Sequence, residues 1–275
     1  MSLVPPLRRS LREPEGDHAQ RVRQMFSRIA GRYDLLNTVL SFGLHRRWRH
    51  LAVREARKAA PGGAALQLAL DVCCGTGELA LEFARSFRFV AAADFSLPML
   101  ALARRKMQGA RVAYLAADAL RLPFAEGSFE AAGAAFSLRN VESVPALLAE
   151  MKRVVRPGGV VMTLEFSRPP NAFFRAVYHF YLRHLLPRIG GFVSPGAYRY
   201  LAASIEAFLV PEELADLFRR AGLEEVRWRL LSGGVVAVHL GRRPDHRSGS
   251  PRGRGSHGEL SLRARAAPRP KEYRG

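Results

Sequence analysis

The stretch DVCCGTGELA, from Asp71 to Ala80, decides the fold of this chain. Asp71 ends an apolar run, Gly75 and Gly77 follow it two residues apart, and helix-forming residues come next. Glycines at such a point allow a tight turn from strand to helix and let a ligand lie against bare backbone. The spacing also satisfies the dinucleotide pattern G-x-G-x-x-G/A through Ala80, so a nicotinamide enzyme is an open alternative. The other interpretation is a glycine turn that serves packing only.

Strand-like and helical segments alternate on both sides of this turn. Five apolar stretches are typical of strands covered on both faces: Leu66–Val72, Arg88–Asp94, Arg111–Ala117, Phe129–Phe136 and Gly159–Phe166. Between them, Ser96 is a candidate helix N-cap, and Asn140–Val155 has apolar residues at helical spacing. Glu224–Leu231 and Gly233–Leu240 predict a closing hairpin. This order predicts an α/β fold with a mostly parallel sheet.

Composition narrows the class of protein. The 275 residues are 48% apolar and 24% charged, which excludes a disordered polymer and allows one large core. Lys and Arg number 43 against 24 Asp and Glu, and the net charge of +19 favours anionic partners such as phospholipid head groups or nucleic acid. The two cysteines, Cys73 and Cys74, are adjacent, so we expect no disulfide and a reducing compartment. We expect neither a signal peptide nor a membrane-spanning helix.

The charge is distributed unevenly, and the composition of the two ends suggests a division into three segments. Gly241–Gly275 contains ten Lys or Arg against three Asp or Glu, with almost no large apolar residues. Such a segment cannot bury enough surface to offset its ordering entropy. We therefore predict disorder in residues 1–20 and in a basic tail, 242–275, on either side of one domain spanning 21–241.

Two further strand ends extend the candidate site. Asp94 ends the second strand 17 residues after Gly77, where a carboxylate can accept hydrogen bonds from both hydroxyls of a ribose. That ribose occurs in dinucleotides and in S-adenosylmethionine alike. The third strand ends at Asp118 and Ala119, where a short polar side chain and a backbone amide can read an adenine edge. The alternative for Asp118 is a cap on the turn before Leu120.

Several motifs in series resemble known enzymes. DVCCGTGELA, Asp94, ADALRLPFAEGSFE (Ala117–Glu130) and RVVRPGGVV resemble the S-adenosylmethionine-dependent class I methyltransferases. Within that class, the chain resembles the quinone-biosynthesis C-methyltransferases that methylate demethylmenaquinol or a polyprenyl benzoquinol. The motifs that carry this closer resemblance are GRYDLLNTVLSFGLHRRWR (Gly31–Arg49), FSLRNV (Phe136–Val141), LEFSRP (Leu164–Pro169), LPRIGG and YRYLAASI (Tyr198–Ile205). The resemblance covers about residues 21–241. It implies a Rossmann-like, seven-stranded, mostly parallel sheet with one antiparallel strand and a helical N-terminal element.

The resemblance also implies site residues. The positions matching the S-adenosylmethionine site are Asp71, Gly75, Thr76, Gly77, Asp94, Asp118 and Ala119. Arg139, Asn140, Tyr33 and His45 match catalytic positions, and Asn37, Trp48 and Tyr198 match positions on the quinol. No metal is implied. Two departures from the family pattern stand out: Cys73–Cys74 replaces small residues before the glycines, and Ala135 stands where a serine often contacts the cofactor.

The chemistry of the implied reaction assigns roles to these residues. A sulfonium methyl donor is already activated, so catalysis is largely positioning. A ring carbon becomes nucleophilic when a hydroquinone loses its phenolic proton, so the reduced quinol is the expected substrate. Arg139 is expected to stabilise the phenolate, and Tyr33 or His45 to relay the proton. The competing interpretations are a turn anchor for Arg139 and core packing for the aromatic residues of the N-terminal element.

One predicted helix is amphipathic. Its apolar face holds Phe173, Val177, Phe180 and Tyr181, and its polar face holds Arg175, His179 and Arg183. This pattern is typical of a helix at a lipid interface, although an ordinary surface helix has it too. We expect a cytoplasmic protein that binds a lipid quinol and contacts the anionic inner face of the cell membrane peripherally. A homodimer is an open alternative to a monomer.

The acceptor and the function class have alternatives. Demethylmenaquinol is the favoured acceptor, and a 2-polyprenyl benzoquinol is the second. A basic nucleic-acid-binding protein is the alternative from a different class, motivated by the net charge of +19. We expect no specific nucleic acid, because no motif that reads RNA or DNA occurs.

Overall fold

The computed structural model describes residues 34, 37–39, 41–60, 67–106, 111–186, 188 and 195–245, without the side chains of 195–199. These residues belong to the unit Met1–Asp245, and the second unit, His246–Gly275, lies outside them. The predicted disordered segment 1–20 and most of the predicted tail therefore lie outside the described residues. The three-segment division stays a prediction.

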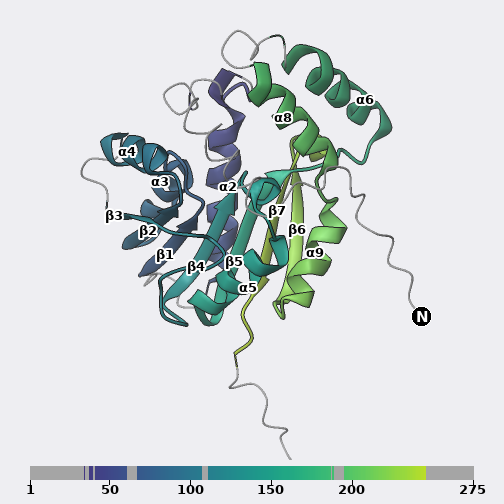
Figure 1. Ribbon diagram of the computed structural model, residues 1–275. Coiled ribbons are helices and arrows are strands. Elements are labelled where there is room, and N and C mark those ends of the chain that lie inside the picture. The colour runs from purple at the N-terminus through teal and green to yellow at the C-terminus, as the bar shows by residue number, and fades with distance from the viewer. Residues whose placement is uncertain are drawn as a thin grey trace, which may run out of the picture. The chain divides into compact units, whose positions relative to one another are not determined.

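Seven strands form one sheet in the order β3-β2-β1-β4-β5-β7-β6 (Figure 1). They are β1 (Leu68–Val72), β2 (Phe89–Asp94), β3 (Val112–Ala116), β4 (Phe129–Ala135), β5 (Val155–Phe166), β6 (Glu224–Leu231) and β7 (Val236–Arg242). Strands β1 to β5 pair in parallel, whereas β7 is antiparallel to both of its neighbours. The predicted Rossmann-like class with one antiparallel strand and a closing hairpin is confirmed.

Helices cover both faces of this sheet. They are α2 (Leu44–Ala59), α3 (Glu78–Ala84), α4 (Leu97–Lys106), α5 (Val144–Val154), α6 (Ala172–Phe180), α8 (Pro195–Ala207) and α9 (Pro211–Arg220), with short turns η2 (Leu138–Asn140), η3 (Tyr181–Leu185) and η4 (Ser232–Gly234). Trp48 of α2 and Phe83 of α3 belong to the apolar core on one face, and Leu147 of α5 and Phe218 of α9 to the core on the other. Helices α6 and α8 lie beyond the carboxyl ends of the parallel strands (Figure 1).

Strand β5 begins earlier than the sequence predicts. The expected start was Gly159, but Val155 already pairs with Phe129 of β4. The next pairs join Val160 to Ala131, so five residues of β5 advance opposite two residues of β4. The extra residues form a bulge, which explains how Pro157, Gly158 and Gly159, residue types common in turns, lie inside a strand.

One helix start differs from prediction, and one predicted side-chain cap is not formed. The helix expected from Asn140 begins at Val144, because the hydroxyl of Ser143 accepts a hydrogen bond of 3.2 Å from the amide of Ala146 and caps it. Asn140 instead belongs to η2. Ser96 does precede α4, but its buried hydroxyl has no hydrogen-bond partner among the described residues, so the predicted side-chain cap is absent there.

Candidate cofactor and substrate site

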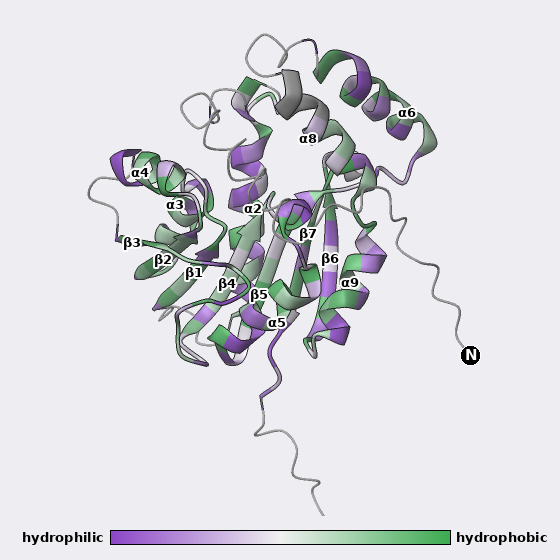
Figure 2. Cartoon of the chain, viewed as in Figure 1, coloured by the Kyte–Doolittle hydropathy of each residue, from purple (hydrophilic) through white to green (hydrophobic). Residues whose placement is uncertain are grey.

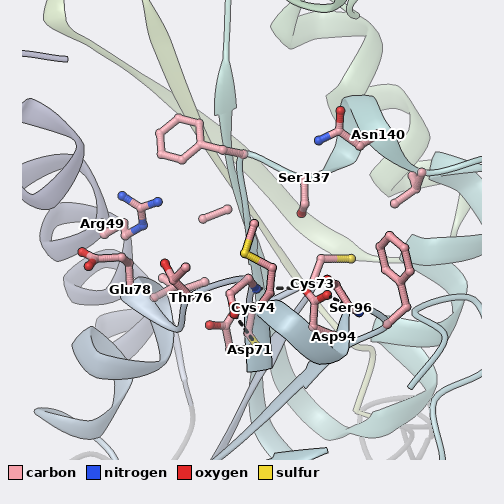
Figure 3. A pocket seen from close by; sticks show the side chains of 17 residues that line it. Arg49, Asp71, Cys73, Cys74, Thr76, Glu78, Asp94, Ser96, Ser137 and Asn140 are labelled. Carbon is pink, nitrogen blue, oxygen red and sulfur yellow. Dashed lines mark hydrogen bonds between the residues drawn. The ribbon is translucent and has the colours of Figure 1, made fainter. Parts of the chain in front are cut away.

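A cavity lies at the carboxyl ends of β1, β2 and β4 (Figure 3). Its lining residues are Arg49, Asp71, Cys73, Cys74, Gly75, Thr76, Glu78, Leu79, Asp94, Phe95, Ser96, Met99, Ala135, Phe136, Ser137, Asn140 and Val141. They come from α2, from the ends of β1, β2 and β4 and the loops that follow them, and from the first residues of α3 and α4. Open α/β sheets bind ligands in this position, because the loops after adjacent parallel strands converge there.

The glycine turn forms the floor of the cavity. Gly75 and Gly77 have positive φ angles of 54° and 81°, which side chains rarely adopt. A Cβ atom on Gly75 would meet no atom within 4 Å, so a side chain there would project into the cavity. The predicted reason for glycine at this point, contact between a ligand and bare backbone, is consistent with this open space.

Two backbone amides fix the carboxylate of Asp94 through its two oxygens. Oδ2 accepts a hydrogen bond from the amide of Gly75, and Oδ1 accepts one from the amide of Ser96, both at 2.8 Å. Burial raises the pKa of Asp94, and these two amides oppose that effect. Each oxygen keeps a further lone pair for a ligand hydroxyl. The geometry therefore suits the predicted role on a ribose diol.

Asp71 and Arg49 add opposite charges to the cavity wall. Asp71 is completely buried. Burial raises the pKa of Asp71 well above its usual range, while the backbone amide of Ala80 and the nearby Arg49 oppose that effect. The Arg49 guanidinium is also buried and lies 5.0 Å from the centroid of the Phe136 ring.

His45 holds Arg49 and does not line the cavity. Its Nδ1 lies 2.7 Å from Nη1 of Arg49, and its Nε2 lies 3.1 Å from the hydroxyl of Thr38, which itself donates to the carbonyl of Asp34. Burial and the adjacent Arg49 lower the pKa of His45 to about 4, so the ring is neutral near pH 7. Because both ring nitrogens are engaged, the geometry gives no support to the predicted proton relay.

Arg139 is buried in an ion pair away from the cavity lining. Its Nη1 lies 2.7 Å from Oε1 of Glu165 and donates to the carbonyl of Phe136 at 2.8 Å. This is the geometry of the turn anchor, the competing interpretation of the motif. Its neighbour Asn140 does line the cavity, and the Asn140 side-chain oxygen accepts a hydrogen bond of 3.1 Å from the hydroxyl of Tyr200.

The remaining predicted cofactor residues divide into two groups. Thr76 lines the cavity, and its hydroxyl donates to Oδ1 of Asp34 at 2.6 Å. Asp118 and Ala119 are not among the lining residues. Instead, Oδ1 of Asp118 accepts from the amide of Leu120 at 2.9 Å, as in the capping alternative. Their proposed role at the adenine edge stays a prediction.

Two of the three predicted quinol-binding residues, Trp48 and Asn37, do not line the cavity. Trp48 is buried in the core, and its indole N–H donates to the hydroxyl of Ser232 at 2.8 Å. Asn37 accepts hydrogen bonds through its carbonyl from Ser41 and is not among the lining residues. Tyr33 and the side chain of Tyr198 lie outside the described residues.

Several lining residues were missed from the sequence. Ser137 and Cys73 follow strand ends, a position that marks site residues in this fold, but neither type was assigned a role. Burial raises the pKa of both Cys73 and Cys74, which makes their thiols poor nucleophiles.

Arg49 could have been predicted as a lining residue from its spacing. It lies one helical turn after His45, a predicted site residue, and therefore on the same face of α2. Among the described residues, no cluster of His, Cys, Asp and Glu is arranged to hold a metal ion.

The sequence is similar to a family of methyltransferases. The model of the ubiE/COQ5 methyltransferase family matches residues 15–243. The demethylmenaquinone methyltransferase of Thermus thermophilus is 47% identical over 226 residues, covering 80% of this chain and 100% of that protein. The Mycobacterium marinum protein of the same name is 47% identical over 225 residues, covering 81% and 94%.

Solved structures agree on the fold. A crystal structure of an S-adenosylmethionine-dependent methyltransferase from Thermotoga maritima matches with a TM-score of 0.55 at 20% identity, covering 81% of this chain and 99% of that one. The family match spans both the glycine turn and the loop after β4, and it excludes the nicotinamide enzyme left open by the glycine pattern. This chain belongs to the ubiE/COQ5 methyltransferase family.

Proposed function

We propose that this chain transfers a methyl group from S-adenosylmethionine to a ring carbon of demethylmenaquinol, giving menaquinol. The observation that carries the proposal is the cavity with Gly75 and Asp94 on its walls, in a chain 47% identical over the full length of a demethylmenaquinone methyltransferase. The alternative acceptor in the same family is a 2-polyprenyl benzoquinol.

The residues present fit the cofactor. Asp94 offers two fixed carboxylate oxygens for the ribose hydroxyls, and the bare backbone of Gly75 leaves room beside them. When bound, S-adenosylmethionine supplies a methyl group already activated by the sulfonium. The work left to the protein is to orient the acceptor and to exclude water.

The loop after β4 is the acceptor side in this proposal. Phe136 and Val141 provide apolar surface for an aromatic ring, whereas Ser137 and Asn140 provide polar groups for its oxygens. The hydroxyl of Tyr200 occupies the side-chain oxygen of Asn140, so the Asn140 amide nitrogen remains to donate to a phenolic oxygen. A hydrogen bond to that oxygen stabilises the phenolate, which makes the neighbouring ring carbon nucleophilic.

The acceptor class is tested by competition. The enzyme is incubated with S-adenosylmethionine and an equal mixture of demethylmenaquinol and the matching benzoquinol, both kept reduced, and the products are identified by mass. We expect methylation of the naphthoquinol in large excess. Preferential methylation of the benzoquinol would overturn the acceptor assignment and leave the methyltransferase assignment intact.

We further propose that α6 is the surface that contacts an anionic membrane. Four of its large apolar side chains are more than half exposed: Phe173 at 72%, Phe174 at 57%, Val177 at 52% and Phe180 at 59%. No residue of α6 is buried, and Figure 2 shows polar and apolar residues interleaved along it. Tyr181, expected on the same face, instead packs against the small cluster around Leu182, because η3 begins there with π-helical geometry.

Polar residues of α6 and of the turn after it connect the helix to α8 and carry positive charge. Glu206 of α8 accepts from Nε of Arg183 at 2.8 Å and lies 3.1 Å from Nδ1 of His179. Arg175, a half-buried residue of α6, and the exposed Arg168 shortly before the helix add further positive charge. Exposed aromatic residues surrounded by arginines suit an interface with anionic lipid head groups, where the lipid quinol also resides. No helix within the described ranges is long and apolar enough to cross a membrane.

Vesicle sedimentation tests this surface. The double variant Phe173→Ser/Phe180→Ser should lose most binding to phosphatidylglycerol vesicles. The control is Phe89→Ser, which removes an exposed phenylalanine from the amino end of β2, whereas α6 lies beyond the carboxyl ends of the parallel strands (Figure 1). Equal vesicle binding by the double variant and the control would refute the proposal. A change of oligomeric state with unchanged vesicle binding would assign the face to a homodimer instead.

A further inference from the structure

The cofactor proposed above has two chemically different ends. Its ribose carries a diol, and its other end is an amino acid with a carboxylate and an ammonium. Asp94 occupies one side of the cavity, and Arg49, Thr76 and Glu78 lie on the other (Figure 3). With the ribose at Asp94, the amino-acid end therefore reaches the wall that contains Arg49.

Arg49 is suited to bind an anion at that wall. Its guanidinium is buried, so its charge is only weakly screened by solvent. Its Nη1 lies 2.7 Å from Nδ1 of His45 and donates to the His45 carbonyl at 3.2 Å, and its Cζ lies 5.0 Å from the centroid of the Phe136 ring. A planar guanidinium fixed in this way presents a fork of donors that matches a carboxylate.

The tautomer of His45 determines how Arg49 is held. A neutral imidazole has one donor and one acceptor nitrogen. The hydroxyl of Thr38 donates to the carbonyl of Asp34, so it accepts from Nε2 of His45. Nδ1 is then the acceptor, and it faces Nη1 of Arg49 at 2.7 Å. His45 thus fixes the direction of the guanidinium without reaching the cavity.

Acidic side chains for the ammonium also line the cavity. Asp71 is completely buried and lies beneath Cys74, between the Asp94 side and the Arg49 side (Figure 3). Glu78 also lines the cavity, and its carboxylate is paired with Nζ of Lys106. Arg49 and Glu78 thus place charges of both signs on one wall, as a zwitterion requires.

We propose that Arg49 binds the carboxylate at the amino-acid end of the cofactor, and that His45 is a positioning residue that directs Arg49. This inference rests on the proposed function, and it makes one wall of the same cavity specific for the amino-acid end of the cofactor. It predicts that Arg49 contributes only to ligands that carry the amino-acid end.

Calorimetry with two ligands tests the inference. S-adenosylhomocysteine carries the amino-acid end, and 5′-methylthioadenosine lacks it. Arg49→Met should weaken S-adenosylhomocysteine binding by about tenfold to a hundredfold, the range for a lost charge-assisted hydrogen bond. The dissociation constant for 5′-methylthioadenosine should stay within about twofold. The control Arg47→Met removes an exposed arginine from the same helix and should change neither affinity.

Two variants of His45 separate positioning from general structural support. His45→Asn keeps an oxygen acceptor near the place of Nδ1 and should retain most of the affinity for S-adenosylhomocysteine. His45→Leu should lose affinity for S-adenosylhomocysteine while keeping its affinity for 5′-methylthioadenosine. A merely structural role would lower both affinities together, and the asparagine variant would not restore either one.

Each other outcome has a definite meaning. Equal losses for both ligands in Arg49→Met, or no loss for either, would overturn the inference. Where Arg49→Met does not fold, Arg49→Lys replaces it: a loss confined to S-adenosylhomocysteine supports the inference, and any other pattern contradicts it. Failure of the unmodified protein to bind either ligand would instead refute the proposed function.

Discussion

Replacing Arg139 by methionine tests whether this residue is primarily an anchor. Its guanidinium and the carboxylate of Glu165 are 2.7 Å apart, with side chains only 5% and 1% exposed. Removing one partner of a buried ion pair leaves an uncompensated charge, which typically costs about 3–5 kcal/mol. Arg139→Met should therefore lower the free energy of unfolding by about that amount, a large part of the ~5–15 kcal/mol of a typical domain.

The ion pair also supports the loop after β4. Glu165 accepts hydrogen bonds from the amides of Leu138 and Phe166, and Arg139 donates to the carbonyl of Phe136. Loss of activity in an Arg139 variant is thus expected to follow from displacement of Phe136 and Asn140 as well as from any direct effect on substrate. Turnover alone does not separate these causes.

Urea unfolding of a double-mutant cycle makes the separation. Arg139→Met and Glu165→Gln are measured singly and together, and the double variant should be more stable than the sum of the single effects predicts, by at least about 1 kcal/mol. Additive effects, or a loss below about 1 kcal/mol in Arg139→Met, would refute the anchoring role. Arg139 would then be free to act on the substrate, as the sequence predicted.

Three further predictions follow from single contacts. Asp94→Ala should weaken S-adenosylhomocysteine binding by at least about tenfold, because the ribose loses charged acceptors; unchanged affinity in calorimetry would contradict this role. Ser143→Ala should lower the free energy of unfolding by about 1 kcal/mol through loss of the α5 cap, measured by urea titration. Burial lowers the pKa of His239 to about 4, and its Nε2 donates to the carbonyl of Pro211. The unfolded chain therefore binds a proton first, so stability should fall as the pH drops from about 6.5 to 4, by up to about 1.4 kcal/mol per pH unit. His239→Gln keeps a donor and should reduce that slope, and an unchanged slope would exclude His239 as its source.

The fold was predictable because its signals are local and repeated. Apolar runs, the glycine turn after Asp71 and the hairpin turn at Ser232–Gly234 each specify their own conformation. Errors arose where tertiary pairing decided the outcome. The bulge in β5 depends on its register with β4, and no local signal in the Pro-Gly-Gly sequence gives that register.

The site was predictable in part, for a related reason. Asp94 ends a strand, Gly75, Thr76 and Asn140 follow strand ends, and the topology brings those ends together. Arg139 and His45 carry side chains suited to catalysis, but their hydrogen bonds are formed with Glu165 and Arg49. Sequence spacing cannot show the direction of a side chain. That direction distinguishes a cavity wall from a supporting contact.

The most direct test of the central claim is transfer of an isotopically labelled methyl group. The enzyme is given labelled S-adenosylmethionine with demethylmenaquinone, once kept reduced as the quinol and once kept oxidised, and the product is analysed by mass and fragmentation. We predict one labelled methyl group on a ring carbon of the reduced substrate and none on the oxidised form. Label on oxygen, equal labelling of the oxidised quinone, or no transfer to either form would contradict the account.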